Sequence, residues 1–126
     1  MKTINHLEPA SLEVTAETIR SYADLTGDYN PLHLDPVFAA STPMGRVIAH
    51  GTMSICLLFS SIERSFPGIR LDAMELDVKF TSPVYEGDHI TAGGRRKDGG
   101  GNQFEVWVRA EDDNVRLSGL LTLPTA

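Results

Sequence analysis

The sequence predicts an α+β fold in which a curved antiparallel sheet of about five strands wraps around one central apolar helix. The most apolar stretch of the chain, residues 47–68, places apolar side chains on nearly every side of a helix, namely Met53, Ile55, Cys56, Leu57, Leu58, Phe59 and Ile62. A helix of that kind in a soluble protein has to be enclosed. The second half of the chain contains alternating apolar and polar segments separated by turn residues, which is the pattern of antiparallel strands. A sheet around the helix is the simplest way to combine the two.

The bulk properties indicate one ordinary domain over residues 1–126. A single cysteine excludes an intrachain disulfide, so we expect a reducing, cytoplasmic location. No stretch reaches the ~20 apolar residues of a membrane span, so we expect no membrane partner. The net charge of -6 argues against nucleic acid, whose phosphates require a clustered cationic surface.

The first elements are short. Residues 11–14 favour a strand, and residues 15–27 favour a helix that Thr15 caps and Gly27 ends. Because a residue before proline is biased toward extended geometry, we expect residues 26–33 to form an ordered loop.

A second short helix is predicted to have Asp35 as its N-cap and Pro36 at its first helical position. The stretch 42–46 then interrupts the regular structure again. Thr52 is placed to cap the central helix, which Pro67 and Gly68 end. The predicted strands of the sheet follow at 72–85, 89–97, 103–111 and 115–123. Their turn signals include the glycine-rich run "KDGGGNQ" at 97–103.

The loop "TGDYNPLHLDP" contains the first candidate for chemistry. Asp28 and His33 would lie roughly 140° apart on a continuous helix. The bend at Asn30 and Pro31 instead allows both side chains to face the same side and to hold one water molecule, because a carboxylate accepts hydrogen bonds and an imidazole titrates near neutral pH. The alternative is that Asp28 and Asn30 satisfy turns and His33 is a half-buried polar residue.

The segment "AHGT" at 49–52 contains the second candidate. Gly51 lies at the start of the central helix, where backbone N–H groups have no partner within the helix. Such donors suit the negative charge that develops on a carbonyl oxygen. The alternative is a plain helix start, at which glycine eases a sharp entry.

Three segments together resemble a known family. "YADLTGDYNPLHLDPVFAAS", "GRVIAHGTM" and "KFTSPVYEGDHIT" are similar to the hydratase motif and the later strands of the MaoC-like (R)-specific enoyl-CoA hydratases, over residues 10–123. The resemblance implies the hot-dog fold, with Asp28 and His33 as catalytic residues and the Gly51 N–H as the oxyanion donor. It implies that Asn30 organises the loop or binds substrate. It gives His50 a counterpart in the family's His-Gly pair, either binding substrate or packing beside the helix start.

The resemblance implies hydration of trans-2-enoyl-CoA to (R)-3-hydroxyacyl-CoA, or the reverse dehydration, without a metal or redox cofactor. The alternatives are a dehydratase for acyl-carrier-protein thioesters and a thioester-binding subunit without turnover; a thioesterase fits the motif less well. The family also implies a homodimer joined edge to edge, or a dimer of dimers.

Four weaker signals remain. The basic run 94–97 and Arg46 are candidates for the phosphates of coenzyme A, although a solvated face is the more common role of such clusters. Cys56 is expected in the core, and Trp107 in the core or an interface.

Overall fold

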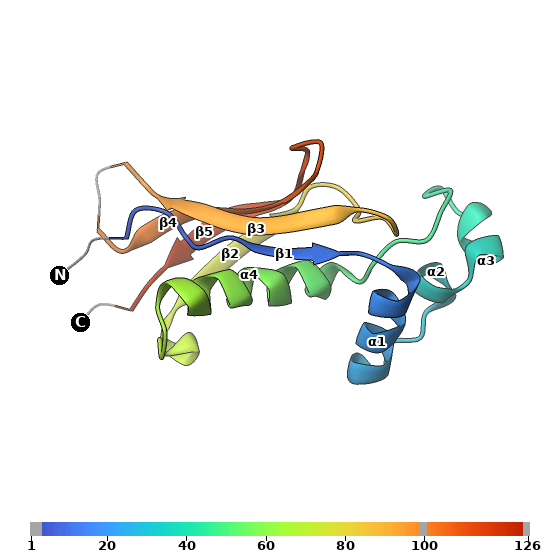
Figure 1. Cartoon of the computed structure of the whole chain (residues 1–126), viewed down its shortest axis with the longest axis horizontal. Helices are drawn as coiled ribbons and strands as arrows, with labels where there is room; N and C mark the ends of the chain where they lie inside the picture. The colour runs from blue at the N-terminus through green and yellow to red at the C-terminus, as the bar shows by residue number, and fades with distance from the viewer. Residues whose placement is uncertain (1–3, 99–100, 125–126) are drawn as a thin grey trace.

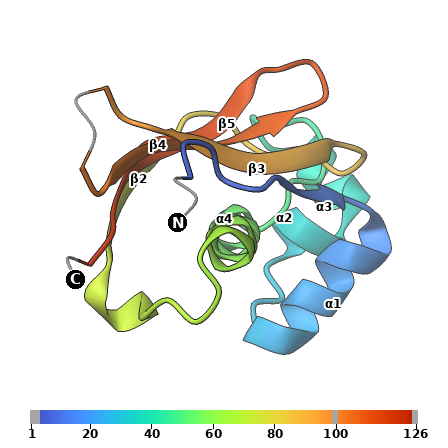
Figure 2. The same cartoon turned by 60° about the vertical axis from the view of Figure 1, so that its left-hand side comes forward.

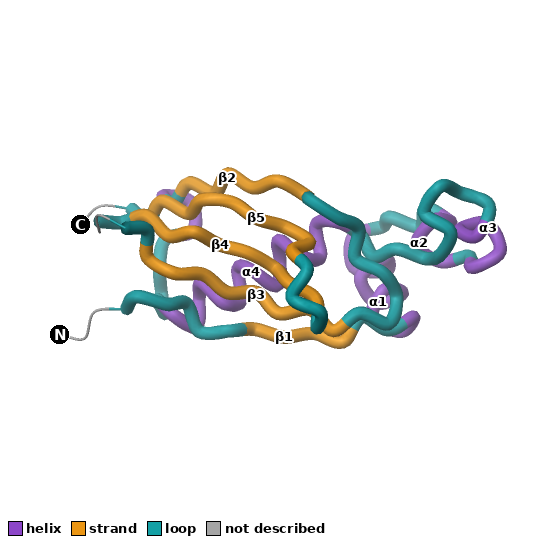
Figure 3. The backbone as a smooth tube through the Cα atoms, turned by 90° about the horizontal axis from the view of Figure 1, so that it is seen from above, coloured by secondary structure: helices purple, strands orange, loops and turns teal. Residues whose placement is uncertain are grey.

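The computed structural model describes residues 4–98 and 101–124 and has a five-stranded antiparallel sheet with one long helix against it. The order of the strands across the sheet is β1-β3-β4-β5-β2 (Figure 3). The elements along the chain are β1 (Ala10–Glu13), α1 (Ala16–Thr26), α2 (Pro31–Leu34), α3 (Pro36–Ala40), α4 (Gly51–Ser65), a 3₁₀ turn (Leu71–Ala73), β2 (Glu75–Phe80), β3 (His89–Arg96), β4 (Gln103–Ala110) and β5 (Val115–Thr122).

The core lies between the concave face of the sheet and α4, which runs beneath the strands (Figures 1 and 2). Alternate residues of β4 point to this core: Phe104, Val106 and Val108 are buried. Leu58 and Ile62 of α4 are fully buried in the same cluster. The predicted α+β architecture, with the sheet curved over a central helix, is confirmed.

The prediction that α4 is enclosed on every side is wrong for the single chain. The sheet covers one side of the helix, and Cys56, Ser60 and Glu63 on another side are exposed. At about 100° per residue, Cys56 points roughly opposite to the buried Leu58. The expected place of Cys56 in the core is therefore also wrong.

Trp107 lies on the outer face of the sheet, because it alternates with the inward-facing Val106 and Val108 along β4. Its ring is half-buried and packs under the guanidinium of Arg109, whose Cζ lies 4.2 Å from the ring centroid. A core role for Trp107 is excluded, and an interface role remains a prediction.

The start of α4 differs from the expectation. His50 is the N-cap residue and makes no side-chain capping bond, and Thr52 lies inside the first turn. The Thr52 hydroxyl instead accepts a hydrogen bond from the Tyr22 hydroxyl at 2.7 Å. The Thr52 side chain thus bonds to another helix instead of capping its own, and the capping pattern in the sequence does not reveal this contact.

The link between α1 and α3 is more helical than predicted. Thr15 caps α1 and Gly27 ends it in the left-handed region, as expected. Residues 26–33, predicted as a loop, include most of α2, because Asn30 caps a helical turn that has Pro31 at its first position.

Asp35 caps α3 through two backbone bonds, from the N–H groups of Val37 at 3.0 Å and Phe38 at 3.2 Å. We expect Asp35→Ala to lower the free energy of unfolding by about 0.5–2 kcal/mol, because both donors lose their acceptor. Urea unfolding followed by circular dichroism measures this. Glu63→Ala, which removes an exposed carboxylate from α4, is the control, and an equal loss in the two variants would contradict the capping role.

The strands predicted from the alternating segments are all present, with shorter bounds. β2 occupies only residues 75–80 of the predicted 72–85, because the 3₁₀ turn precedes it and Pro83 follows it. The glycine-rich turn 97–103 joins β3 to β4, and residues 99–100 within it lie outside the described residues. Within the described part of the chain, no helix is long and apolar enough to cross a membrane.

Candidate active site

The three short helices gather at one end of the sheet, beside the first turn of α4 (Figure 1). Asp28 lies in the link between α1 and α2, His33 lies in α2, and His50 precedes α4. Each residue offers one ligand or hydrogen-bonding atom, and these atoms lie within 4.8 Å of one another. Residues 22 positions apart are thus brought into one cluster.

The hydrogen bonds fix which nitrogen of His33 is free. Its Nδ1 lies 2.7 Å from the carbonyl oxygen of Ile48. A carbonyl only accepts, so Nδ1 carries the hydrogen and, in the neutral ring, Nε2 carries the lone pair. The Nε2 atom lies 4.0 Å from Oδ2 of Asp28. The free lone pair therefore faces a carboxylate.

Asp28 and His33 are too far apart for a direct hydrogen bond and are well placed to share a third atom. Atoms 4.0 Å apart can both bond one water oxygen at ordinary lengths of about 2.8 Å. The Asp28 side chain is 52% exposed and the His33 side chain 12%, so water reaches the gap from the side of the carboxylate. The sequence prediction that these two side chains face one side agrees with this geometry.

Asn30 organises the segment between them. Its side-chain oxygen accepts from the N–H of Leu32 at 3.0 Å, and its own N–H donates to Oδ1 of Asp28 at 3.2 Å. Asn30 thus fixes one carboxylate oxygen and leaves Oδ2 turned to His33. The loop-organising role expected for Asn30 agrees with these bonds, and its contact with substrate stays a prediction.

His50 is buried, at 3% exposure, and touches both partners. Its ring stacks on the ring of His33, with the centroids 3.9 Å apart and the planes at 28°. Its Nε2 lies 2.9 Å from the backbone oxygen of Asp28. The Tyr22 ring lies on another side, 5.1 Å away by centroid.

Tyr22 ties this cluster to α4. Burial raises the pKa of Tyr22 above its ordinary value, and its hydroxyl donates a hydrogen bond to Thr52. The sequence does not predict that Tyr22 of α1 belongs to the site. Tyr22 is the first residue of the motif segment that begins "YADLTG", but the segment gives no role for it, because that role depends on how two distant helices pack.

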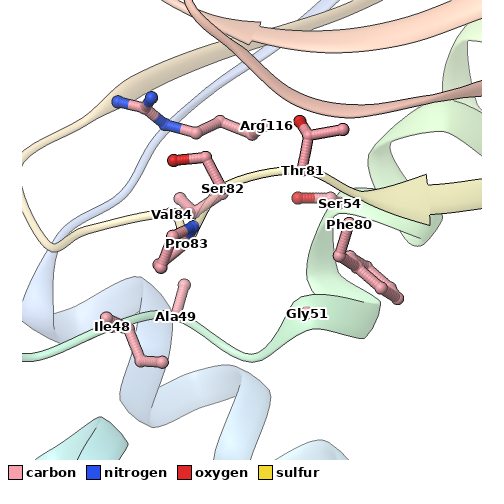
Figure 4. Close-up of a pocket in the computed structure, with 10 residues that line it drawn as sticks. All are labelled: Ile48, Ala49, Gly51, Ser54, Phe80, Thr81, Ser82, Pro83, Val84 and Arg116. Carbon is pink, nitrogen blue, oxygen red and sulfur yellow. The ribbon is translucent and has the colours of Figure 1, made fainter. Parts of the chain in front are cut away.

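Gly51 lies at the wall of a neighbouring pocket of about 280 Å³. Figure 4 shows the Phe80 ring beside Gly51, with Arg116 and Ser82 across the pocket from Ile48 and Ala49. A Cβ atom on residue 51 would lie 3.2 Å from Cε1 of Phe80, so a larger residue at this position would crowd the ring. As the first residue of α4, Gly51 has an N–H without an acceptor inside the helix.

The pocket and the Asp28/His33 pair are joined through one segment of backbone. The Ile48 carbonyl holds His33, the next residue but one is His50, and Gly51 follows it. Asp28 and His33 themselves do not line the 280 Å³ pocket. The Ile48 carbonyl is a functional group that side-chain motifs cannot reveal, since any residue supplies it.

The three ligand-type side chains suit proton transfer better than a metal ion. The lone pairs of an imidazole lie in the plane of its ring, and two stacked rings direct them side by side rather than at one point. Two of the four ring nitrogens already face backbone oxygens.

The basic residues near the β3–β4 turn make contacts within the chain. Arg95 pairs with Glu105 at 3.1 Å, and Arg96 donates to the Ile4 carbonyl at 2.6 Å. Arg46 stacks on Tyr85, with Cζ 4.1 Å from the ring centroid. These contacts favour the structural role over the phosphate-binding one.

Comparison with known proteins shows the family to which this chain is similar. The model of the MaoC like domain matches residues 5–115. The (R)-specific enoyl-CoA hydratase of Aeromonas caviae is 38% identical over 77 residues, which are 61% of this chain and 58% of that protein. The 3-hydroxybutyryl-CoA dehydratase of Methylorubrum extorquens is 36% identical over 78 residues, which are 62% of this chain and 50% of that protein. The matches thus span only about half the length of these relatives.

A solved structure agrees over the whole fold. The (R)-hydratase from Aeromonas caviae involved in PHA biosynthesis has a TM-score of 0.75 at 26% identity, covering 98% of this chain and 100% of that one. The five-stranded sheet and its central helix are therefore the hot-dog fold expected from the sequence. Because the family model covers most of the sequence and the fold agrees, the chain belongs to the MaoC-like domain family.

Proposed function

We propose that this protein adds water to a trans-2-enoyl thioester to give an (R)-3-hydroxyacyl thioester, and catalyses the reverse dehydration. The observation that supports this most is the pair formed by Nε2 of His33 and Oδ2 of Asp28, 4.0 Å apart with the lone pair of the imidazole unused. The (R) product is expected because the Aeromonas caviae relative, at 38% identity, is an (R)-specific enoyl-CoA hydratase.

The proposed steps use only groups of the chain. His33 accepts a proton from a water that Asp28 orients, and the water oxygen forms a bond to the β carbon. The electron pair of the double bond moves toward the thioester, and the N–H of Gly51 stabilises the negative charge on its oxygen. The proton taken up by the Asp28/His33 pair then passes to the α carbon, which completes the addition of H and OH and restores the neutral His33. Dehydration runs through the same groups in reverse.

The pocket beside Gly51 is the proposed place for the thioester end of the substrate. Its walls are largely apolar, with Ile48, Phe80 and Val84 among them. We propose coenzyme A as the carrier, because both relatives described above are named for CoA substrates. An acyl-carrier-protein thioester is the alternative, and an activity panel with both carriers distinguishes them.

We also propose a homodimer in which the sheets meet at an edge. β2 is an edge strand, and its Phe80 is 56% exposed although it lies beside the proposed oxyanion donor. Unpaired strand edges are commonly protected by pairing with a second copy. Sedimentation equilibrium should give about twice the chain mass of 13.8 kDa, and a mass of 13.8 kDa at micromolar concentration would contradict the dimer.

The activity test follows the loss of the enone absorbance of crotonyl-CoA and assigns the configuration of the product. We expect turnover with an (R)-3-hydroxyacyl product. Binding of C4 to C12 enoyl thioesters by the folded protein without any turnover, on either carrier, would instead show a thioester-binding subunit.

A further inference from the structure

One buried histidine contacts both members of the proposed catalytic pair. We propose that His50 is a positioning residue, which holds the backbone of Asp28 and the ring of His33 in their working geometry without touching substrate. This inference rests on the proposed function and replaces the substrate contact expected for His50 from the sequence.

The first contact ties Asp28 to the start of α4. The partner of Nε2 of His50 is a backbone carbonyl, which only accepts, so Nε2 carries a hydrogen and donates it at 2.9 Å. Among the described residues, the N–H of Asp28 has only a long contact, to the Thr26 hydroxyl at 3.4 Å. The bond from His50 is therefore the shorter of the two, and it connects the backbone of Asp28 to the start of the central helix.

The second contact fixes the plane of His33. The Nδ1 bond to Ile48 at 2.7 Å holds one edge of the imidazole. The ring of His50, 3.9 Å away and tilted by 28°, covers one face. Because the terminal torsion of a histidine ring is soft, an edge contact alone leaves the ring free to swing. The face contact removes that motion and keeps Nε2 directed at the carboxylate.

Packing alone does not explain the histidine. Its Nδ1 is buried and has no hydrogen-bond partner within the described residues, and a buried nitrogen of that kind costs stability. An apolar ring would fill the same space without that cost, but it would lack the N–H that Asp28 receives. The 3% exposure, with His33 and Tyr22 as ring neighbours, also keeps His50 away from a substrate.

Two substitutions separate the contacts. His50→Phe keeps an aromatic face for His33 and removes the donor, whereas His50→Gln places an amide N–H near the position of Nε2. With crotonyl-CoA as substrate, we expect His50→Phe to lower kcat at least ~10-fold with KM within ~3-fold of wild type, because misplacing a catalytic group acts on the chemical step. We expect His50→Gln, which keeps a donor but loses the ring face over His33, to lower kcat at least ~3-fold below wild type, also with KM within ~3-fold.

The control is His89→Gln, which changes an exposed histidine of β3 and should leave both constants unchanged. A rise in KM with kcat unchanged would show a substrate contact and overturn the proposal. So would a wild-type kcat in both variants. If the wild-type protein itself turns over no enoyl thioester, the proposed function fails, and the measurement below still tests the geometry.

That measurement is the tautomeric state of each imidazole in the wild-type protein, read from long-range ¹H–¹⁵N correlations at about pH 8, where ordinary imidazoles are neutral. We expect the hydrogen on Nε2 of His50 and on Nδ1 of His33. A hydrogen on Nδ1 of His50 would overturn the proposal, because Nε2 then has nothing to donate to Asp28. This result decides the case even if a variant fails to fold.

Discussion

Asp28→Asn and His33→Ala are each expected to lower kcat by at least ~10²-fold with little change in fold. Asparagine keeps the oxygen that accepts from the N–H of Asn30 at 3.2 Å and removes the negative charge that faces His33. Alanine at position 33 removes the base itself. Steady-state hydration of crotonyl-CoA measures both effects, and circular dichroism checks the fold.

Asp24→Asn is the matched control for the first variant. Asp24 also lies near the C-terminal end of α1, and its carboxylate is exposed to a similar degree, 57% against 52% for Asp28. It pairs with Arg20 and accepts from the hydroxyl of Tyr29, the residue after Asp28, and it has no bond to Asp28 or His33 among the described contacts. Near-full activity of Asp28→Asn or His33→Ala would refute the assignment.

Gly119→Ala is expected to have the largest effect on stability, lowering the free energy of unfolding by about 3 kcal/mol or more. A Cβ atom at position 119 would lie 2.1 Å from the carbonyl oxygen of Asp77 and 2.8 Å from Cα of Val78. Both atoms belong to the backbone of β2, so β2 and β5 would have to separate there. Thermal and denaturant unfolding would report the loss.

Gly93→Ala is the control for this substitution. Gly93 also lies inside the sheet, but its new Cβ would meet the side chain of Trp107, 3.1 Å from Nε1. The Trp107 side chain can shift where a backbone cannot, so this variant should lose much less stability. Equal losses at positions 93 and 119 would show that the glycines act through general flexibility rather than through the close approach of β2.

The pairing of Asp28 with His33 could be anticipated from sequence because the chain has to bend between them. Asn30 and Pro31 prevent one continuous helix, and a short link leaves few ways to separate two side chains five positions apart. The same reasoning missed the helical turn of α2, because an asparagine before a proline serves equally as a loop signal and as a helix cap. Local sequence does not decide between those two uses.

The surroundings of α4 were harder to predict for a different reason. Apolar residues such as Leu57 and Phe59 suggested complete enclosure, yet one sheet can cover only one side of a helix, and Cys56 is left exposed in the single chain. His50 carries no signal of its own role either. Its contacts join residues 17 and 22 positions away, so they exist only once α2 and α4 have packed together.

In the proposed mechanism, one water lies between Asp28 and His33 while the Gly51 N–H faces the thioester oxygen. A crystal structure of Asp28→Asn with bound crotonyl-CoA tests it most directly. We predict a water oxygen within about 3.2 Å of both Nε2 of His33 and the side chain of residue 28, on the β-carbon side of the substrate, with the thioester oxygen within the same distance of the Gly51 nitrogen. A thioester oxygen bound away from Gly51, or a β carbon turned away from His33, would contradict the mechanism.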